Sequence, residues 1–332
     1  MHLLQPIRAL ALVVLSAAVT AVSTAAVQTP GKAEPRQGQR EKLDSKDAGE
    51  RICGLRDEIE RIRFEMGRPK SSPPILEVRN AVPREIYSQA LTLFQKASQL
   101  DFELTGERIS APEKQTTGID LGLVSTVLDT VLARLLHVQA NLGILPRPGP
   151  RQSGPECDSV DLFGEIVQLG RQLDLMLDRR LGPADVFEEV TLAVGYAARL
   201  LSRFPQAVRI PRVPRLERGK TPVDVYQCLL SCLSRVQDLA QAAGIPMLEI
   251  HTRAVHLENV VPSDVYDVST LLVSELSFFH SVAPATEMPN ERYFPGRRFP
   301  SHVYQRAGLL EAQLVELQKW AAARQDWLYS KR

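Results

Sequence analysis

Four arginines recur at every third position of a proline-rich stretch, and they are the residues best placed to do chemistry. The stretch reads RIPRVPRLER and contains Arg209, Arg212, Arg215 and Arg218. A polyproline II segment has three residues per turn, so this spacing predicts four guanidinium groups along one edge. Such groups hold carboxylates and phosphates through paired hydrogen bonds. The row therefore predicts a binding edge for an acidic protein or an anionic polymer. The alternative is a solvated loop whose arginines pair with acids of nearby helices.

Two histidines are weaker candidates for a metal site. His251 and His256 lie close to Glu249 and Glu258 in a later connecting segment. Their spacing matches neither a helical zinc motif nor a zinc ribbon, so surface or packing histidines are the favoured interpretation. We therefore predict no metal and no other cofactor.

The familiar signatures of enzymes are missing from the chain. It contains no GxSxG, no P-loop, no HExxH and no GxGxxG motif. Folding can still bring catalytic groups together, so an enzyme is the least favoured class rather than an excluded one. The formal net charge is +1, and it falls to about zero without residues 1–26. A chain with this balance is not built as a whole for nucleic acid or for an acidic membrane surface.

The four cysteines leave the disulfide pairing open. Cys228 and Cys232 are one helical turn apart, where a bridge would be strained, and Cys232 falls on an apolar stripe. We predict a buried thiol at Cys232. Cys53 has two alternatives, which are a bond with Cys157 and a bridge to a second chain.

The elements that must position the arginine row begin with a recurring six-residue motif. Proline at the first helical position has a suitable φ angle, and an acid two residues later meets the positive end of the helix dipole. Each copy therefore predicts a helix start. The copies are VPREIY at 82–87, GPADVF at 182–187, TPVDVY at 221–226, VPSDVY at 261–266 and FPSHVY at 299–304.

An apolar stripe with a spacing of 4-3-4-3-4 follows each start, with Ser269 as the one exception. Such a stripe is typical of helices that pack nearly parallel in a bundle. Two further segments, led by Asp120 and Asp161, follow the pattern more loosely. The sequence thus predicts an all-α fold with about seven amphipathic core helices in a repeat array or bundle. Among the predicted core positions are Leu93, Leu200, Val236, Leu276 and Leu314.

Long connections between the later helices predict their direction. Residues 205–220, 245–260 and 284–298 each form a connection of about fifteen residues. Such a segment reaches about 45 Å when extended, more than the roughly 30 Å of a twenty-residue helix. The chain can return along the outside and start the next helix in the same direction, which explains starts about 39 residues apart. An up-and-down bundle with long loops is the alternative. The short link 181–183 instead predicts a tight antiparallel hairpin.

The N-terminal part predicts export. Residues 1–26 combine one cation, an apolar run and small residues, as in a signal peptide; an uncleaved membrane anchor is the alternative. Residues 27–47 are polar and predict a flexible leader. Residues 48–67 carry a heptad stripe, which favours either a coiled coil that makes a homo-oligomer or an amphipathic helix docked on its own chain.

The remaining chain is expected to form two helical subdomains. These cover residues 70–145 and 157–332, with a Pro/Gly-rich linker at 146–156. We expect no transmembrane domain after signal removal. The favoured function is an exported, non-catalytic scaffold or adaptor that binds an envelope protein or anionic polymer. The periplasm is the favoured location, and an extracellular location is the alternative. The alternative is a periplasmic small-ligand-binding or sensor protein with a pocket between helices.

Overall fold

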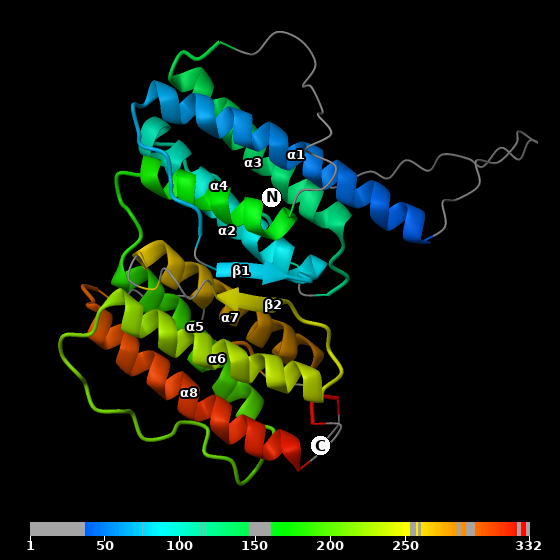
Figure 1. Cartoon of the computed structure of the whole chain (residues 1–332), viewed down its shortest axis with the longest axis vertical. Helices are drawn as coiled ribbons and strands as arrows, with labels where there is room; N and C mark the ends of the chain where they lie inside the picture. The colour runs from blue at the N-terminus through cyan, green and yellow to red at the C-terminus, as the bar shows by residue number, and fades with distance from the viewer. Residues whose placement is uncertain are drawn as a thin grey trace, which may run out of the picture. The chain divides into compact units, whose positions relative to one another are not determined.

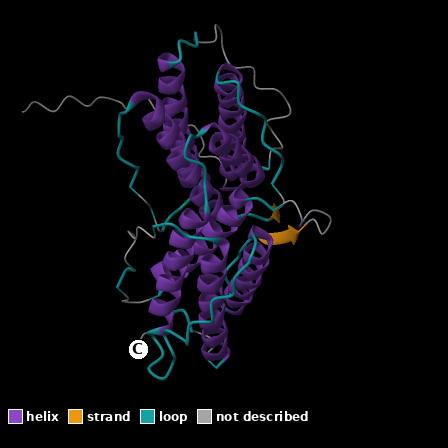
Figure 2. Ribbon diagram, turned by 90° about the vertical axis from the view of Figure 1, so that its left-hand side faces the viewer, coloured by secondary structure: helices purple, strands orange, loops and turns teal. Residues whose placement is uncertain are grey.

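The described part of the chain is all-α, with eight helices and one two-stranded sheet (Figures 1 and 2). The predicted signal peptide lies outside it. The computed structural model describes residues 37–74, 76–113, 115, 117–145, 161–252, 257, 260–283, 287–289, 296–323 and 327–329. The helices are α1 (Gln37–Glu65), α2 (Pro83–Thr105), α3 (Leu121–Asn141), α4 (Leu162–Met176), α5 (Pro183–Leu201), α6 (Pro222–Ala242), α7 (Pro262–Val282) and α8 (Pro300–Ala322). The strands are β1 (Leu76–Arg79) and β2 (Glu249–Thr252).

The first four helices pack as one group, in which α1 and α2 each contact both α3 and α4. Where two of these helices touch, a higher residue number on one helix contacts a higher residue number on the other. The four helices therefore run in the same direction. The pairs are Arg51 with Asp129 and Arg61 with Gln139 between α1 and α3, Arg56 with Glu165 and Arg68 with Asp178 along α1 and α4, and Lys96 with Gly170 and Glu103 with Asp178 along α2 and α4.

The last four helices form a second parallel group, in which α5 and α6 each contact both α7 and α8. Their starting residues Pro183, Pro222, Pro262 and Pro300 line one small apolar cavity, so all four helices begin at the same end. The long connections therefore do return the chain to its starting end. The up-and-down alternative is wrong for this group.

The acid of the recurring motif does more than meet the helix dipole. The backbone N–H of Thr221 donates to Asp224 Oδ2 at 2.7 Å, and the N–H of Asp224 donates back to Thr221 Oγ1 at 3.4 Å. In the last copy, where histidine replaces the acid, the N–H of Phe299 donates to His302 Nδ1 at 3.1 Å. Each of these side chains satisfies a donor that the helix itself leaves unpaired.

The predicted stripe forms the core. Leu93, Leu200, Val236, Leu276 and Leu314 are all at most 1 % exposed. Their burial confirms the five helix assignments on which the repeat rests.

The N-terminal helix differs in extent from its prediction. It begins at Gln37, inside the segment 27–47 that was predicted to be a flexible leader. Its stripe, from Ala48 to Ile62, is buried against α3 and α4 of the same chain. This arrangement corresponds to the docked alternative, and it leaves that stripe covered within one molecule.

The two helix groups run in opposite directions and belong to one compact unit. Across α2 and α7, Arg84 pairs with Glu275 while Gln89, further along α2, bonds Thr270, which is earlier in α7. Strands β1 and β2 pair antiparallel at the same junction. The link between α4 and α5 reverses the chain as predicted, but the two helices join different groups instead of packing as a hairpin. This corrects the hairpin prediction.

The division into subdomains at 146–156 stays a prediction, because that whole segment lies outside the described residues. Helix α4 follows it in sequence and packs on α1 and α2 of the first group. The change from one group to the other falls in the link between α4 and α5.

Candidate functional site

The arginine row lies on the connection between α5 and α6, which runs back along α8 (Figure 1). Gln313 Nε2 donates to the carbonyl oxygen of Arg209 at 2.7 Å, and Gln305 Nε2 donates to that of Pro214 at 2.8 Å. Residue numbers fall along α8 as they rise along the connection. The segment is therefore antiparallel to α8, as a returning connection must be.

A glycine on α8 lets this segment approach closely. A Cβ atom on Gly308 would lie 3.2 Å from Cγ of Pro214, which is tight for any side chain. Pro211 and Pro214 are half-buried. Because prolines already restrict the backbone and two side-chain amides hold its carbonyls, the segment has a defined course on the surface.

All four arginines of the row are exposed. Within the described residues, none of their guanidinium groups makes an ion pair or a hydrogen bond, so the pairing with helix acids that the alternative requires is not seen there. The one acid inside the row, Glu217, pairs with Lys220 Nζ at 2.9 Å. That hydrogen bond raises the pKa of Lys220. The row thus keeps four positive charges available.

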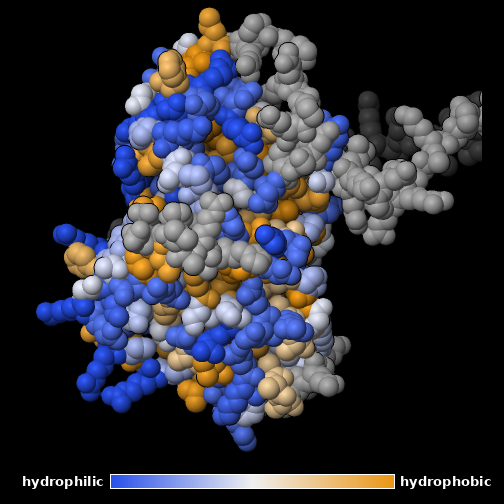
Figure 3. Space-filling view, viewed as in Figure 1, coloured by the Kyte–Doolittle hydropathy of each residue, from blue (hydrophilic) through white to orange (hydrophobic). Residues whose placement is uncertain are grey.

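A second exposed row alternates with the arginines. Ile210, Val213 and Leu216 are 67 %, 51 % and 44 % exposed. Together with the arginines they form what we call the arginine–aliphatic ridge, residues 209–218. On the corresponding side of Figure 3, long hydrophilic side chains project from the surface. The sequence carried a signal for this row, because the aliphatic residues follow the same three-residue period as the arginines.

The histidine candidates gain no support from the described residues. His251 lies in β2, where its backbone is opposite Glu77, but its side chain and the whole of His256 are outside the described part. No group of three or more His, Cys, Asp or Glu among the described residues could hold a metal ion.

The described cysteines separate into two kinds. Cys228 and Cys232 are free thiols, and Cys232 is buried. The hydrogen bond with Cys228, together with burial, raises the pKa of the Cys232 thiol well above its usual value. A thiol of this kind stays protonated and is a poor nucleophile. Cys53 is disulfide-bonded, and Cys157 lies outside the described residues.

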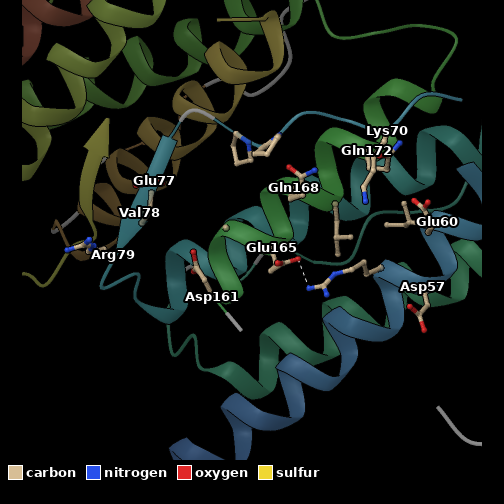
Figure 4. A pocket seen from close by; sticks show the side chains of 16 residues that line it. Asp57, Glu60, Lys70, Glu77, Val78, Arg79, Asp161, Glu165, Gln168 and Gln172 are labelled. Carbon is tan, nitrogen blue, oxygen red and sulfur yellow. Dashed lines mark ion pairs between the residues drawn. The ribbon is translucent and has the colours of Figure 1, made fainter. Parts of the chain in front are cut away.

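A groove of about 740 Å³ runs between α1, α4 and the segment that leads into β1 (Figure 4). Half of its lining residues are charged, and they are of both signs, including Lys70, Glu77 and Asp161. In its middle Arg56 pairs with Glu165 at 2.7 Å. The volume suits a small ligand, but apolar surface usually dominates such sites.

A buried charged layer lies where the two helix groups meet, and sequence reasoning missed it. Arg171 of α4 pairs with Asp264 of α7 and lies 3.9 Å from Asp267 Oδ2. Burial raises the pKa of Asp267 to about 6. On the α2 side of α7, Arg84 pairs with Glu275 at 2.9 Å.

Glu85 extends this layer to the segment after α6. It accepts hydrogen bonds from the N–H of Leu248 at 2.9 Å and of Val82 at 2.7 Å. Burial, with the nearby Glu275, raises the pKa of Glu85 to about 8. The layer joins elements far apart in sequence, which indicates a structural role at the junction.

Comparison of the chain with protein-family models, curated proteins and solved structures finds no match. Among the described helices, one, α3, is long and apolar enough to cross a membrane, a property that core helices of soluble proteins share. Two charged residues of α3 form ion pairs within the first helix group: Asp129 pairs with Arg51, and Arg134 pairs with Asp101.

Because the comparisons find no match, the proposals below rest on the sequence and geometry of this chain alone.

Proposed function

We propose that the chain is an exported, non-catalytic helical scaffold that binds an acidic protein or an anionic polymer of the cell envelope. The observation that carries the proposal is the row of four exposed arginines, for which the described residues supply no ion pair, on a segment that α8 holds by two hydrogen bonds. Export rests on the apolar run Ala9–Val22 and the small residues after it.

The fixed course of the segment supports recognition of an extended anionic partner. Successive arginines in a polyproline II segment are about 9 Å apart, so a fully extended row would present charge over roughly 28 Å. A segment that is already ordered loses less conformational freedom on binding than a loose loop does. Because the charges face water, binding should weaken steeply with salt.

The second proposal is a small-ligand-binding or sensor protein. The groove between α1 and α4 supports it by its volume of about 740 Å³. Its mixed charges would suit a polar, zwitterionic ligand. This second proposal would be favoured if such a ligand bound saturably, if Lys70→Ala abolished that binding, and if substitution of the four arginines left it unchanged.

Binding of the full chain to polyglutamate tests the leading proposal. The ridge variant changes Arg209, Arg212, Arg215 and Arg218 to glutamine, and the control variant changes four other exposed arginines, Arg79, Arg108, Arg179 and Arg180. Both lose the same charge. We expect the ridge variant to bind at least about tenfold more weakly and with a lower salt dependence, since each lost charge-assisted contact costs about 1 kcal/mol or more.

The control variant should stay within about twofold of the unchanged chain, because a screened surface charge contributes little on its own. Equal losses in the two variants would show that overall charge, rather than the row, holds the polymer. If both variants bound polyglutamate as tightly as the unchanged chain, the proposed function would be wrong.

A further inference from the structure

The two exposed rows of the ridge lie on either side of its outward direction. In a three-residue period the three rows are about 120° apart around the segment. In the third row Pro211 and Pro214 are half-buried and only Glu217, at its end, is exposed, while the arginine and aliphatic rows are exposed throughout. A flat surface that approaches from outside would therefore meet both rows together.

The aliphatic row is unexplained by a purely anionic partner. Ile210, Val213 and Leu216 project from the surface, each more than two-fifths exposed. A polyanion in water offers nothing apolar to cover them. A protein partner would need a matching groove beside its acidic groups. The interface of an anionic bilayer offers phosphates and hydrocarbon side by side, and it deforms to receive side chains.

We propose that the arginine–aliphatic ridge binds the surface of an anionic lipid bilayer, with its arginines on lipid phosphates and its aliphatic side chains in the interfacial region. The proposal rests on the proposed function only in using the same arginine row. It adds a role for Ile210, Val213 and Leu216 that the proposed function does not require.

Binding of the ridge to an anionic bilayer needs both the electrostatic contribution of the arginines and the apolar contribution of the aliphatic side chains. One arginine near an anionic membrane surface strengthens binding by a factor of about five. Partial burial of one aliphatic side chain adds a factor of similar size. The seven side chains of the ridge therefore predict reversible binding that needs both rows.

Co-sedimentation of the full chain with vesicles tests the proposal. Vesicles of pure phosphatidylcholine are compared with vesicles that also contain phosphatidylglycerol. The apolar run Ala9–Val22 is common to all variants, so differences between variants report the ridge. We expect the ridge variant described above to lose about 100-fold or more in binding to the mixed vesicles.

A second variant isolates the aliphatic row. It changes Ile210, Val213 and Leu216 to serine, and its control changes three exposed residues elsewhere, Ile109, Leu136 and Leu145. We expect the first variant to lose about 100-fold in vesicle binding and to keep polyglutamate binding within about twofold. The control should change neither. Circular dichroism and urea unfolding of each variant check that it folds.

The outcomes separate this inference from the proposed function. If the unchanged chain binds mixed and pure vesicles equally while polyglutamate binding depends on the arginines, the lipid inference is wrong and the proposed function stands. If the aliphatic variant binds mixed vesicles as well as the unchanged chain does, the proposed insertion of the aliphatic side chains into the bilayer interface is also wrong. If the arginines matter for neither ligand, both proposals fail.

Discussion

Arginine occupies two contrasting settings in this molecule. Arg171 and Arg84 lie between the two helix groups, with carboxylate partners on α7. The ridge arginines lie on the surface, and no described carboxylate pairs with them. A buried charge needs its partner for the fold to be stable, whereas an exposed charge costs the fold almost nothing. The ridge arginines are therefore free to bind another molecule, and the buried ones are not.

The largest expected effect comes from removing one buried arginine. Arg171→Met removes the guanidinium group that pairs with Asp264 and lies 3.9 Å from Asp267 Oδ2, and loss of one partner in a buried pair costs about 3–5 kcal/mol. The same change at exposed Arg212 should stay within about 0.5 kcal/mol. Urea unfolding of the two variants measures the difference. Similar stabilities would mean that the buried layer does not hold the groups together.

A second prediction concerns pH and the same layer. Because burial raises the pKa of Asp267 from 3.8 to about 6, the folded state holds its proton more tightly than the unfolded state does. The stabilisation is present in full below about pH 4 and is lost as the pH rises through about 6, by up to about 3 kcal/mol. Glu85, whose pKa rises to about 8, acts in the same direction over a wider range.

Asp267→Asn tests this sign. The variant should lose part of the decline in unfolding free energy that the unchanged chain shows between pH 5 and pH 7. The groups that face Asp267 are Lys96 of α2, Arg171 and Asp174 of α4, and Asp264 of α7. Asp178→Asn, which changes an exposed carboxylate, is the control. An unaltered pH profile in Asp267→Asn would contradict the prediction.

Sequence reasoning succeeded where local patterns decide the structure. A proline followed by an acid has one good place in a helix, so the motif located five helix starts, and connection length indicated the direction of the second group. It made no prediction about the second face of α7, which carries the polar residues Asp267, Ser274 and Glu275. These residues are buried because α7 lies between the groups. Contacts between elements far apart in sequence decide that, and no local pattern encodes them.

The candidate site was likewise predicted only in part. The three-residue period of the arginines can be seen in the sequence, and the exposure of all four in the structure agrees with it. Which row would face the protein was not readable, since that depends on Gly308 and the glutamines of α8, about a hundred residues further along the chain. The aliphatic row was overlooked because residues of this type are usually assigned to a core.

The smallest expected effect concerns how firmly the ridge is held. Gln305→Ala combined with Gln313→Ala removes the donors to the carbonyls of Pro214 and Arg209. Each neutral hydrogen bond contributes about 1 kcal/mol, so the pair should cost about 2 kcal/mol at most. Trypsin, which cleaves after arginine, should cut residues 209–218 several-fold faster in this variant. Gln318→Ala, which removes a bond from α8 to Asp238, should leave that cleavage unchanged. If both variants are cut at the same rate, the glutamines do not hold the segment, and the ordered edge that distinguishes the ridge from a loose basic loop is lost.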